Sequence, residues 1–359
     1  MNRRPRRFGR GGGTRRPRAV TIRGWGRPTG GRAFGVRGSG QYAGMSSIEI
    51  VSGPWGTASM PAEAQRGRAL AAWDAFRDLA VRVDPDAPSR LPGWDGRAVI
   101  SHLASWPDAP LLARLLAEAR GRRAPNAAPM AQDEVNARLV DTHRNATHEE
   151  LLAALDDGRA RLAAAFEATA ADPDLGLART GSQVGPVPLL TQLGAIAYEL
   201  AVHALDLAPC GADDPPPALL DAGVLALADI TGALAARHHV RARTGLAVPG
   251  GGWGFAAPGT DGTGWEVFPL PPGRPTLPAV EARTAATLLD ASAGRRPVPT
   301  LLARRDLKPH NLPGLLALAP LLDQVPGLPG GPALRLTATT LSGITRLTTH
   351  LPTLPRPRP

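Results

Sequence analysis

Two kinds of residue are nearly missing from this 359-residue sequence, and each shortage excludes something. The single cysteine, Cys210, rules out an internal disulfide and suits a reducing compartment, so we expect a cytoplasmic protein. Lysine occurs once, at Lys308, although the chain has 41 basic residues in all. Together with abundant alanine, glycine and proline, this bias is typical of a GC-rich genome and says nothing about mechanism.

A hydrophobic run suited to a membrane span is also lacking. The longest apolar stretches cover 216–236, which Asp221 and Asp229 interrupt, and 312–322, which is too short. The first residues, MNRRPRRFGRGGG, carry twin arginines without the apolar segment that a signal peptide places after them. We therefore expect no membrane partner.

Acidic residues are absent from residues 1–44, which hold twelve arginines. The formal net charge of the chain is +10, so the remainder carries 10 − 12 = −2. The Arg/Gly-rich composition predicts a disordered tail, and the high isoelectric point describes this tail only. It is either an RGG-like arm for RNA or sequence that precedes a true start at Met45. The abrupt change of composition favours the second interpretation, which makes residues 1–44 dispensable for folding and a nucleic-acid partner unlikely.

Apolar residues at three- and four-residue steps predict helices between about 61 and 207. Thr147 and Glu150 form a capping-box motif at the start of one of them. Four long amphipathic helices joined by loops predict a mainly α protein with a four-helix bundle. The helices are expected over 61–83, from 95 to an interruption at Pro107, over 147–170 and over 188–207, with a further helix over about 130–143. We assign residues 45–207 to this first domain.

The segment APCGADDPPP, 208–217, breaks the helical pattern and predicts a domain boundary. A helical pattern over 218–240 is followed by strand-like pieces between glycines and prolines, and then by a strand-helix pattern. Residues 218–300 are therefore expected to form a smaller α+β domain. Residues 301–359 are rich in leucine and proline with weak periodicity, and their order is left open.

Glu199 and His203 place a carboxylate and an imidazole four residues apart on a helix stripe that also carries Ile196 and Leu200. Side chains with this spacing lie on the same face and can bind one cation. His102 is on the apolar stripe of an earlier helix. Three nitrogen and oxygen ligands with an open fourth position are typical of catalytic zinc. A Glu–His pair at this spacing is also a common local helix contact, and spacing alone leaves both interpretations open.

Two motifs resemble those of the mycothiol-dependent maleylpyruvate isomerase family, within the DinB-like metalloenzyme superfamily. LPGWDGRAVISHLASW, residues 91–106, is similar to the family's PGW…HLA segment, and AYELAVHALDL, residues 197–207, is similar to its E-L-x-x-H-x-x-D helix. The resemblance extends over about 60–300. It implies a DinB-like four-helix bundle followed by a sterol-carrier-like α+β domain.

Carried over to this sequence, the family's ligands for a divalent metal, zinc, are His102, Glu199 and His203. Many members have Thr or Ser after the tryptophan of the first motif, where this chain has Asp95. Asp95 can still cap the helix that carries His102. The motif therefore departs from the family without losing its structural role.

The resemblance implies a metal-dependent enzyme with mycothiol as its low-molecular-weight thiol. The thiolate adds to a small electrophilic substrate; an isomerase then expels it after rotation, and an S-transferase keeps it attached. Two alternatives remain: a non-catalytic metal-binding or sensor module on the same bundle, and nucleic-acid binding through the arginine tail. The electrophile and the oligomeric state stay open.

Further side chains near these motifs have alternative roles. Asp206, three residues after His203, either hydrogen-bonds a ligand and orients it or caps the helix end. Arg295 and Arg296, in SAGRRP, match a Gly-Arg segment of the family's second domain. Arg295 either binds a substrate carboxylate, as a catalytic residue, or is a solvated surface arginine.

The remaining candidates favour structural interpretations. His143 and His148 flank a helix junction and are expected to be solvated loop residues. His238 and His239 lie near the C-terminal end of a helix, where a positively charged side chain interacts favourably with the helix dipole. Cys210 lies in a loop without an obvious base and is expected to be incidental rather than a reactive thiol.

Overall fold

The structure of the protein is a computed structural model in which four ranges of the chain are described. These are residues 54–108, 110–123, 132–182 and 185–324. The predicted Arg/Gly-rich tail lies outside the described residues, and so does the chain beyond 324.

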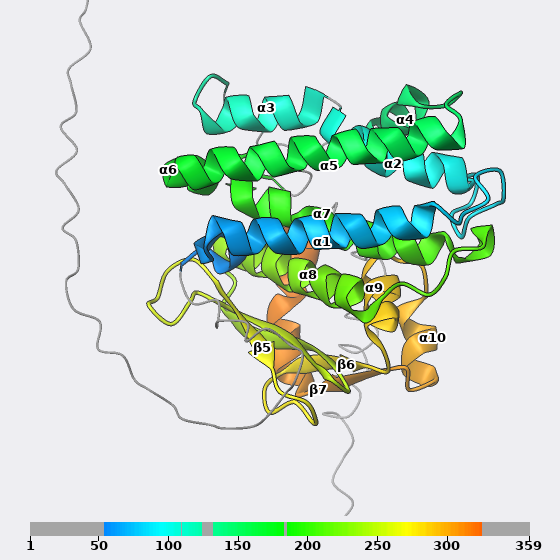
Figure 1. Ribbon diagram of the computed structural model, residues 1–359. Helices are drawn as coiled ribbons and strands as arrows, with labels where there is room; N and C mark the ends of the chain where they lie inside the picture. Colours follow the sequence, from blue (N-terminus) through cyan, green and yellow to red (C-terminus); the bar gives the residue numbers. More distant parts are fainter. Residues whose placement is uncertain (1–53, 109, 124–131, 183–184, 325–359) are drawn as a thin grey trace, which may run out of the picture. The chain divides into compact units, whose positions relative to one another are not determined.

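Four long helices pack side by side and bury their apolar stripes against one another (Figure 1). They are α1 (Ala62–Ala80), α2 (Gly96–Asp108), α5 (His148–Ala171) and α7 (Leu189–Asp206). The core between them holds large side chains that are fully buried, among them Trp73, Phe76, Ile100, Leu155 and Phe166. The indole nitrogen of Trp73 donates to the backbone oxygen of Leu155 at 2.9 Å, so its polar atom is satisfied inside the core. The predicted helical bundle is confirmed.

Shorter elements extend the bundle. They are the 3₁₀ helices η1 (Gly56–Ser59) and η2 (Ala208–Cys210), the helices α3 (Pro110–Ala119), α4 (Gln132–Thr142) and α6 (Pro173–Leu177), and the strands β1 (Arg179–Thr180) and β2 (Val187–Pro188). Of these helices, only α4 was predicted from the sequence. Pro107 lies at the end of α2, as expected, but a helix resumes at Pro110. Strands β1 and β2 pair antiparallel immediately before α7 and so fix where that helix begins.

Polar side chains fix the starts of two bundle helices. At α5 the hydroxyl of Thr147 accepts from the backbone N–H of Glu150 at 3.2 Å, and the Glu150 carboxylate accepts from the backbone N–H of Thr147 at 2.7 Å. The predicted capping box is therefore present. At α2 the Asp95 carboxylate accepts from the backbone N–H of Ala98 at 2.8 Å. Asp95 thus caps the helix that carries His102, as predicted.

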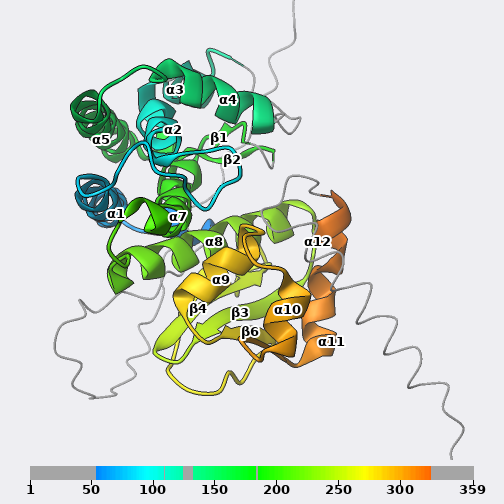
Figure 2. The same ribbon diagram turned by 90° about the vertical axis from the view of Figure 1, so that its right-hand side faces the viewer.

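Helix α8 (Pro217–Arg237) connects the bundle to a five-stranded sheet (Figure 2). One side of α8 packs along α7 and another side packs on β4. The strand order is β5-β4-β3-β6-β7, and all neighbours are antiparallel except β3 and β6. The strands are β3 (Ala242–Val248), β4 (Gly251–Ala257), β5 (Glu266–Leu270), β6 (Ala279–Ala282) and β7 (Leu307–His310). The predicted smaller α+β domain is confirmed.

The sheet extends beyond residue 300, where the sequence analysis ended this domain. Strand β7 pairs with β6, and Pro309 lies opposite Val280. The sequence LKPH gives almost no apolar alternation, and proline is tolerated in β7 because this strand is at the edge of the sheet. The helices of this region are α9 (Ala285–Ser292), α10 (Val298–Ala303), α11 (Leu312–Leu315), η3 (Leu316–Leu318) and α12 (Ala319–Gln324).

Within the described ranges, α8 is the one helix that is long and apolar enough to cross a membrane. Most of it is buried between α7 and the sheet, which is the setting of a core helix rather than of a lipid-facing one. Its two acids have partners inside the protein: Asp221 accepts from the indole N–H of Trp253 at 2.9 Å, and Asp229 lies in a buried cluster described below.

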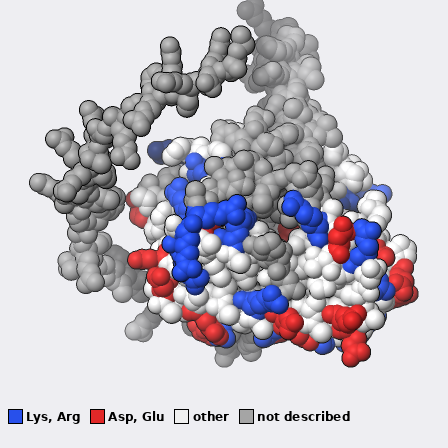
Figure 3. Space-filling model, turned by 90° about the horizontal axis from the view of Figure 1, so that it is seen from above, with Lys and Arg blue, Asp and Glu red and all other residues white. Residues whose placement is uncertain are grey.

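Charged side chains of both signs share the described part of the face that is viewed from above in Figure 3. Side chains of opposite charge lie next to one another there. Ion pairs of the described residues include that of Arg77 with Asp156 at 3.0 Å. The excess positive charge of the sequence therefore does not turn this face into a uniformly basic surface.

Candidate metal centre

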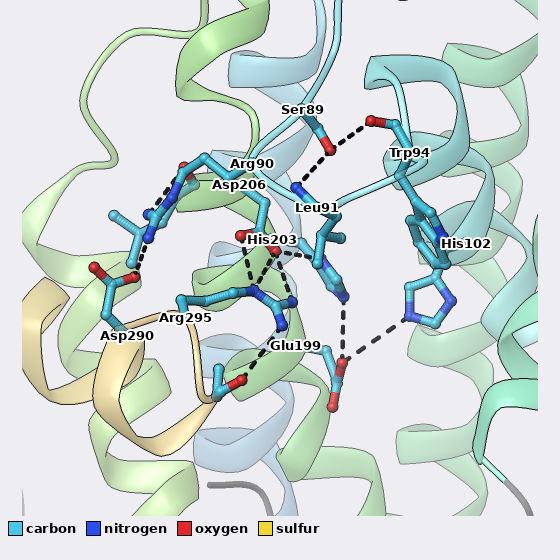
Figure 4. A network of polar contacts seen from close by, with 12 residues as sticks. Ser89, Arg90, Leu91, Trp94, His102, Glu199, His203, Asp206, Asp290 and Arg295 are labelled. Atoms are coloured by element: carbon cyan, nitrogen blue, oxygen red, sulfur yellow. Dashed lines mark hydrogen bonds and ion pairs between the residues drawn. The ribbon is translucent and has the colours of Figure 1, made fainter. Parts of the chain in front are cut away.

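The three side chains predicted as metal ligands meet near the C-terminal end of α7 (Figure 4). Glu199 and His203 project from one face of α7, and His102 reaches them from the middle of α2. The Nε2 atoms of His203 and His102 lie 3.6 and 4.0 Å from Oε2 of Glu199. One donor atom from each residue lies within 4.8 Å of the other two. The fold thus brings together residues that are far apart in the sequence.

These separations are longer than hydrogen bonds. Atoms that coordinate one tetrahedral zinc ion at about 2.1 Å lie about 3.4 Å from each other. The distances between Glu199 and the two imidazoles are therefore closer to those of shared ligands than to those of a hydrogen-bonded pair. A local ion pair on the helix, which was the alternative for Glu199 and His203, is also compatible with a separation of 3.6 Å.

The carboxylate of Asp206 orients the imidazole of His203. Oδ2 of Asp206 lies 3.0 Å from Nδ1 of His203, and the Asp206 side chain is fully buried. A carboxylate accepts at this position, so Nδ1 carries a hydrogen and Nε2 is the ring nitrogen that faces Glu199. The ring of Trp94 is stacked parallel to the His203 ring, with centroids 6.3 Å apart, and limits its rotation. Of the two roles considered for Asp206, the structure favours support of the ligand.

Arg295, from the segment after α9, binds this same carboxylate. Its Nε lies 3.0 Å from Oδ1 of Asp206 and its Nη2 lies 2.9 Å from Oδ2, so the contact is bidentate. Nη1 donates to the backbone oxygen of Ala293 at 3.3 Å. The solvated alternative for Arg295 is thereby removed. Arg296 points elsewhere and pairs with Asp306 at 3.0 Å.

A second arginine, Arg90, connects the loop that contains Pro92–Trp94 to the same region. Arg90 donates from its backbone nitrogen to the carbonyl of Asp206 at 3.0 Å and from Nη2 to the carboxylate of Asp290 at 2.8 Å. The backbone carbonyl of Asp290 in turn accepts from the backbone N–H of Arg295 at 2.8 Å. The loop, the end of α7 and the segment after α9 therefore form one network, which Figure 4 shows. Arg90 and Asp290 were not identified from the sequence, because only tertiary contacts give them this role.

Burial keeps the His102 imidazole neutral. Its side chain is 6% exposed, and burial lowers the pKa of His102 more than the Glu199 carboxylate raises it. The Trp94 ring meets it edge to face, with centroids 5.5 Å apart. Within the described residues Nδ1 of His102 is buried and has no hydrogen-bond partner. A neutral imidazole is the form that binds metals.

The other charges of the centre depend on one another. Burial alone would raise the pKa of Glu199, but His102 and His203 outweigh it and hold that pKa below its usual range. Burial alone would lower the pKa of His203, but Asp206 and Glu199 raise it. Burial would likewise raise the pKa of Asp206, which His203 and Arg295 lower. Both carboxylates are therefore ionised and available as acceptors or ligands.

One side of the centre is open. The side chains of His102 and His203 are only 6% and 7% exposed, whereas that of Glu199 is 38% exposed. A molecule can therefore approach the three donor atoms from the Glu199 side while the two histidines stay packed in the bundle.

The remaining sequence candidates lie away from this centre. Cys210 is buried, its thiol donates to the carbonyl of Ala87 at 3.3 Å, and burial raises its pKa, so it is not a reactive thiolate. His148 is not a loop residue as predicted: it opens α5, and its Nε2 contacts the last carbonyl of α1, that of Ala80, at 2.9 Å. His143 follows α4 directly and is half-buried.

The other two histidines follow α8. His238 is the C-cap of that helix, as its predicted place near a helix end requires. His239 comes next, is exposed and has a φ of 55°.

A second buried carboxylate, Asp229 on α8, was not identified from the sequence. Its Oδ1 accepts from the backbone N–H of Thr57 at 2.9 Å and from the indole N–H of Trp265 at 2.8 Å, and the Thr57 hydroxyl bonds its other oxygen. Burial outweighs these bonds and raises the pKa of Asp229 to about 6. The cluster joins η1, α8 and the start of β5. The sequence feature that could have identified Asp229 is its position as a single acid on an otherwise apolar helix stripe.

Comparison with known proteins finds a family model that matches the bundle. Residues 67–208 match the model described as mycothiol maleylpyruvate isomerase N-terminal domain, and this range contains both motifs from which the resemblance was predicted. The matched range contains His102, Glu199, His203 and Asp206 but not Arg295.

Two solved structures are similar to the chain. They are a crystal structure of the mycothiol-dependent maleylpyruvate isomerase, at 21% identity, and one of a histidine-to-alanine mutant of that enzyme, at 20% identity. Each alignment covers 67% of this chain and 92% of the other, with a TM-score of 0.44. No curated protein matches.

Proposed function

We propose that this chain, whose residues 67–208 form a domain of the mycothiol maleylpyruvate isomerase family, is a metal-dependent enzyme that uses a low-molecular-weight thiol to transform a small electrophile. The thiol is mycothiol and the reaction is a cis-to-trans isomerisation, with transfer of the thiol as the alternative outcome of the same addition. The observation that carries the proposal is the convergence of His102, Glu199 and His203 on one point.

The donor set fits a divalent metal, and zinc in particular. Two imidazoles and one carboxylate with an open position are the ligands of catalytic zinc sites. His203 has its Nδ1 bound by Asp206, which is the carboxylate–histidine arrangement that fixes a metal ligand. His102 and His203 are buried, and both rings lie against Trp94. Binding of an ion would therefore require little further ordering of these two side chains.

A divalent ion held by these residues would lower the pKa of a thiol at its open position and supply thiolate near neutral pH. The chain offers no reactive thiol of its own, because its single cysteine is buried and the pKa of that cysteine is raised. The exposed side of Glu199 gives the cosubstrate thiol its approach. A reducing cytoplasm suits both that free thiol and the reduced Cys210.

The proposed reaction adds the thiolate sulfur to one carbon of a cis double bond that is conjugated to a carbonyl. The electron pair of the double bond moves onto the carbonyl oxygen, and the former double bond becomes free to rotate. When the pair returns, the double bond re-forms as trans and the carbon–sulfur bond breaks, which releases the thiolate unchanged. In the transferase alternative a proton is added instead, and the carbon–sulfur bond remains.

Arg295 has a double role in this proposal. A guanidinium has five N–H groups, and Arg295 uses three of them on Asp206 and on the carbonyl of Ala293. Its two remaining N–H groups are available to a substrate carboxylate beside the centre. Maleylpyruvate, which the family's name specifies, is an anionic cis-unsaturated ketone of this chemistry, and we propose it as the first substrate to test.

The test measures metal content per chain after purification with zinc available, together with mycothiol-dependent conversion of maleylpyruvate. Wild type should hold one zinc ion per chain and be active. His102→Ala, Glu199→Ala and His203→Ala should each lose metal and activity together while their helical circular dichroism survives. His310→Ala is the matched control, because that histidine lies on β7 and contacts Glu281 instead, so its metal and activity should be retained.

Two results would overturn the proposal in different ways. Wild type without stoichiometric metal removes the metal centre altogether. Wild type that binds metal but converts neither maleylpyruvate nor other cis-enones in the presence of mycothiol indicates the non-catalytic metal-binding module instead. If His102→Ala alone keeps full metal affinity, the ion does not bridge α2 and α7.

A further inference from the structure

A cavity of about 370 Å³ lies at the opposite end of α7 from the candidate metal centre. It is bordered by strand β2, by the C-terminal end of α8 and by the residues that precede β3 and β5. Pro188, which lines it, directly precedes the first residue of α7, and Glu199 is eleven residues further along. At 1.5 Å per residue this places the two about 16 Å apart along the helix, so the cavity is a separate site.

Arginines from three segments line this cavity. Arg179 belongs to β1, Arg237 ends α8 and Arg241 precedes β3. No aspartate or glutamate is among the described residues that line it. Within the described part of the chain, neither Arg179 nor Arg241 makes an ion pair. Burial and the charge of Arg179 lower the pKa of Arg237.

The backbone is shaped to hold Arg237 in place. Gly185 has a φ of 94°, and a Cβ atom added there would lie 1.9 Å from Nη1 of Arg237. Only glycine lets the guanidinium approach the loop this closely. The half-buried Arg237 is thus held against the wall of the cavity, while Arg179 and Arg241 are exposed at its rim.

The rest of the lining is largely apolar. Trp55 and Trp265 meet edge to face there, with ring centroids 5.9 Å apart. Asp229 binds the indole N–H of Trp265 and so fixes the orientation of that ring. Val187 and Val240 add aliphatic surface. Cavities that combine apolar walls with a few convergent polar groups, at a volume of several hundred Å³, are typical ligand sites.

We propose that this cavity binds a small organic anion. The carboxylate or phosphate group of the ligand pairs with Arg179, Arg237 and Arg241, and its apolar body lies against Trp55 and Trp265. Arginine suits such groups because its planar N–H donors match two anionic oxygens at once. The site is independent of the proposed function: it uses none of the metal-centre residues.

The test is isothermal titration of the full chain with benzoate, phenyl phosphate and inorganic phosphate. We expect benzoate or phenyl phosphate to bind at one site per chain, with an affinity that falls as ionic strength rises. The stronger of the two identifies the anionic group. Inorganic phosphate, which lacks an apolar body, should bind at least about tenfold more weakly, because it leaves the tryptophan wall uncovered.

Single variants locate the binding. Arg179→Gln and Arg241→Gln should each weaken it about tenfold, since each removes one charge-assisted contact from an exposed side chain that is not needed for folding. Arg304→Gln is the matched control: it removes the same charge from an exposed arginine outside the cavity and should change nothing. Glu199→Gln should bind the anion as wild type does, which separates this site from the metal centre.

Three outcomes would overturn the inference: no saturable binding of either organic anion, equal affinity in wild type and in both rim variants, or loss of binding in Glu199→Gln alone. Inorganic phosphate that binds as tightly as the organic anions would overturn the role of the tryptophans. Unchanged melting temperatures in the two rim variants exclude unfolding as the cause of any loss.

Discussion

Arg295 contacts both carboxylate oxygens of Asp206, at 3.0 and 2.9 Å, and thereby connects the α+β region to the end of α7. Asp206 in turn holds Nδ1 of His203 at 3.0 Å. Arg295 is therefore a positioning residue for a candidate ligand that it does not touch. The candidate centre has its three candidate ligands in the bundle and part of their support in the second half of the chain.

Replacing Arg295 should impair the centre without unfolding the protein. In Arg295→Ala the buried Asp206 carboxylate loses its bidentate partner, so the orientation of His203 becomes less fixed. We expect zinc affinity to fall about tenfold, at the lower end of the effect of outer-shell partners, with partial recovery in Arg295→Lys. Titration of metal-free protein with zinc measures this. Arg296→Ala, which removes the neighbouring arginine that pairs with Asp306, is the control and should bind zinc as wild type does.

Replacing Asp206 should have a larger effect. Asp206→Asn keeps the shape of the side chain but removes the negative charge that supports the imidazole. We expect a 10- to 100-fold loss of zinc affinity, measured by the same titration. Asp306→Asn removes a carboxylate that pairs with Arg296 and Arg283 instead of with His203 or Arg295, and it should leave zinc affinity unchanged. Equal losses in the two variants would contradict a specific role for Asp206.

The buried carboxylate of Asp229 should make stability depend on pH. Its pKa is about 6 in the folded protein and about 4 when unfolded, so the folded state binds more protons between these values. Its contribution to the free energy of unfolding therefore falls as pH rises from 4 to 6 and stays low above that. A difference of about 2 units corresponds to roughly 3 kcal/mol as an order of magnitude.

Asp229→Asn removes this titration and keeps the oxygen that accepts from Thr57 and Trp265. The free energy of unfolding of the variant relative to wild type should therefore rise by about 2–3 kcal/mol between pH 4 and pH 7. Urea unfolding at a series of pH values measures the difference, in which the other titrating groups cancel. Asp261→Asn, in an exposed turn, should show no such trend. A flat difference for Asp229→Asn would show that its carboxyl titrates normally.

A pair of glycine-to-alanine substitutions should act in opposite directions. A Cβ atom at Gly223 on α8 would lie 2.5 Å from Cβ of Ala201 on α7, so Gly223→Ala should force the two helices apart and cost about 1–3 kcal/mol. A Cβ atom at Gly67 on α1 would meet nothing within 4 Å, so Gly67→Ala should stabilise by up to about 1 kcal/mol through helix propensity alone. The denaturant concentration at the midpoint of unfolding measures both effects. Destabilisation by both substitutions would contradict the prediction.

Local patterns predicted the parts of this fold that depend on local physics. The capping box at Thr147 and the cap at Asp95 were readable because each needs only a side chain and a nearby amide. The convergence of three side chains could be predicted because Glu199 and His203 interrupt an apolar stripe and the family motifs added His102. Strand β7 could not be predicted, because the residues of an edge strand need not alternate between apolar and polar, and Pro309 is unfavourable in most strands.

The contacts around the ligands were beyond sequence reasoning for a different reason. The roles of Arg90, Asp290 and Arg295 exist only where three distant segments meet, and no spacing along the chain encodes that meeting. For the same reason, the sequence left two roles open for Asp206: orienting a candidate ligand or capping the helix end. Asp229 could have been flagged as an acid on a buried stripe, but its partners, Thr57 and Trp265, lie far from it in the sequence.

The link between Asp206 and Arg295 also orders events during synthesis. The two residues are 89 positions apart, and all three candidate ligands precede both. At about 5–20 residues per second, a ribosome needs roughly 4–18 s to add that stretch. During this interval the nascent chain already contains every ligand, while the guanidinium that neutralises Asp206 has not yet been made. Completion of the centre is therefore a late step in the biogenesis of the protein, and it depends on the C-terminal part of the chain.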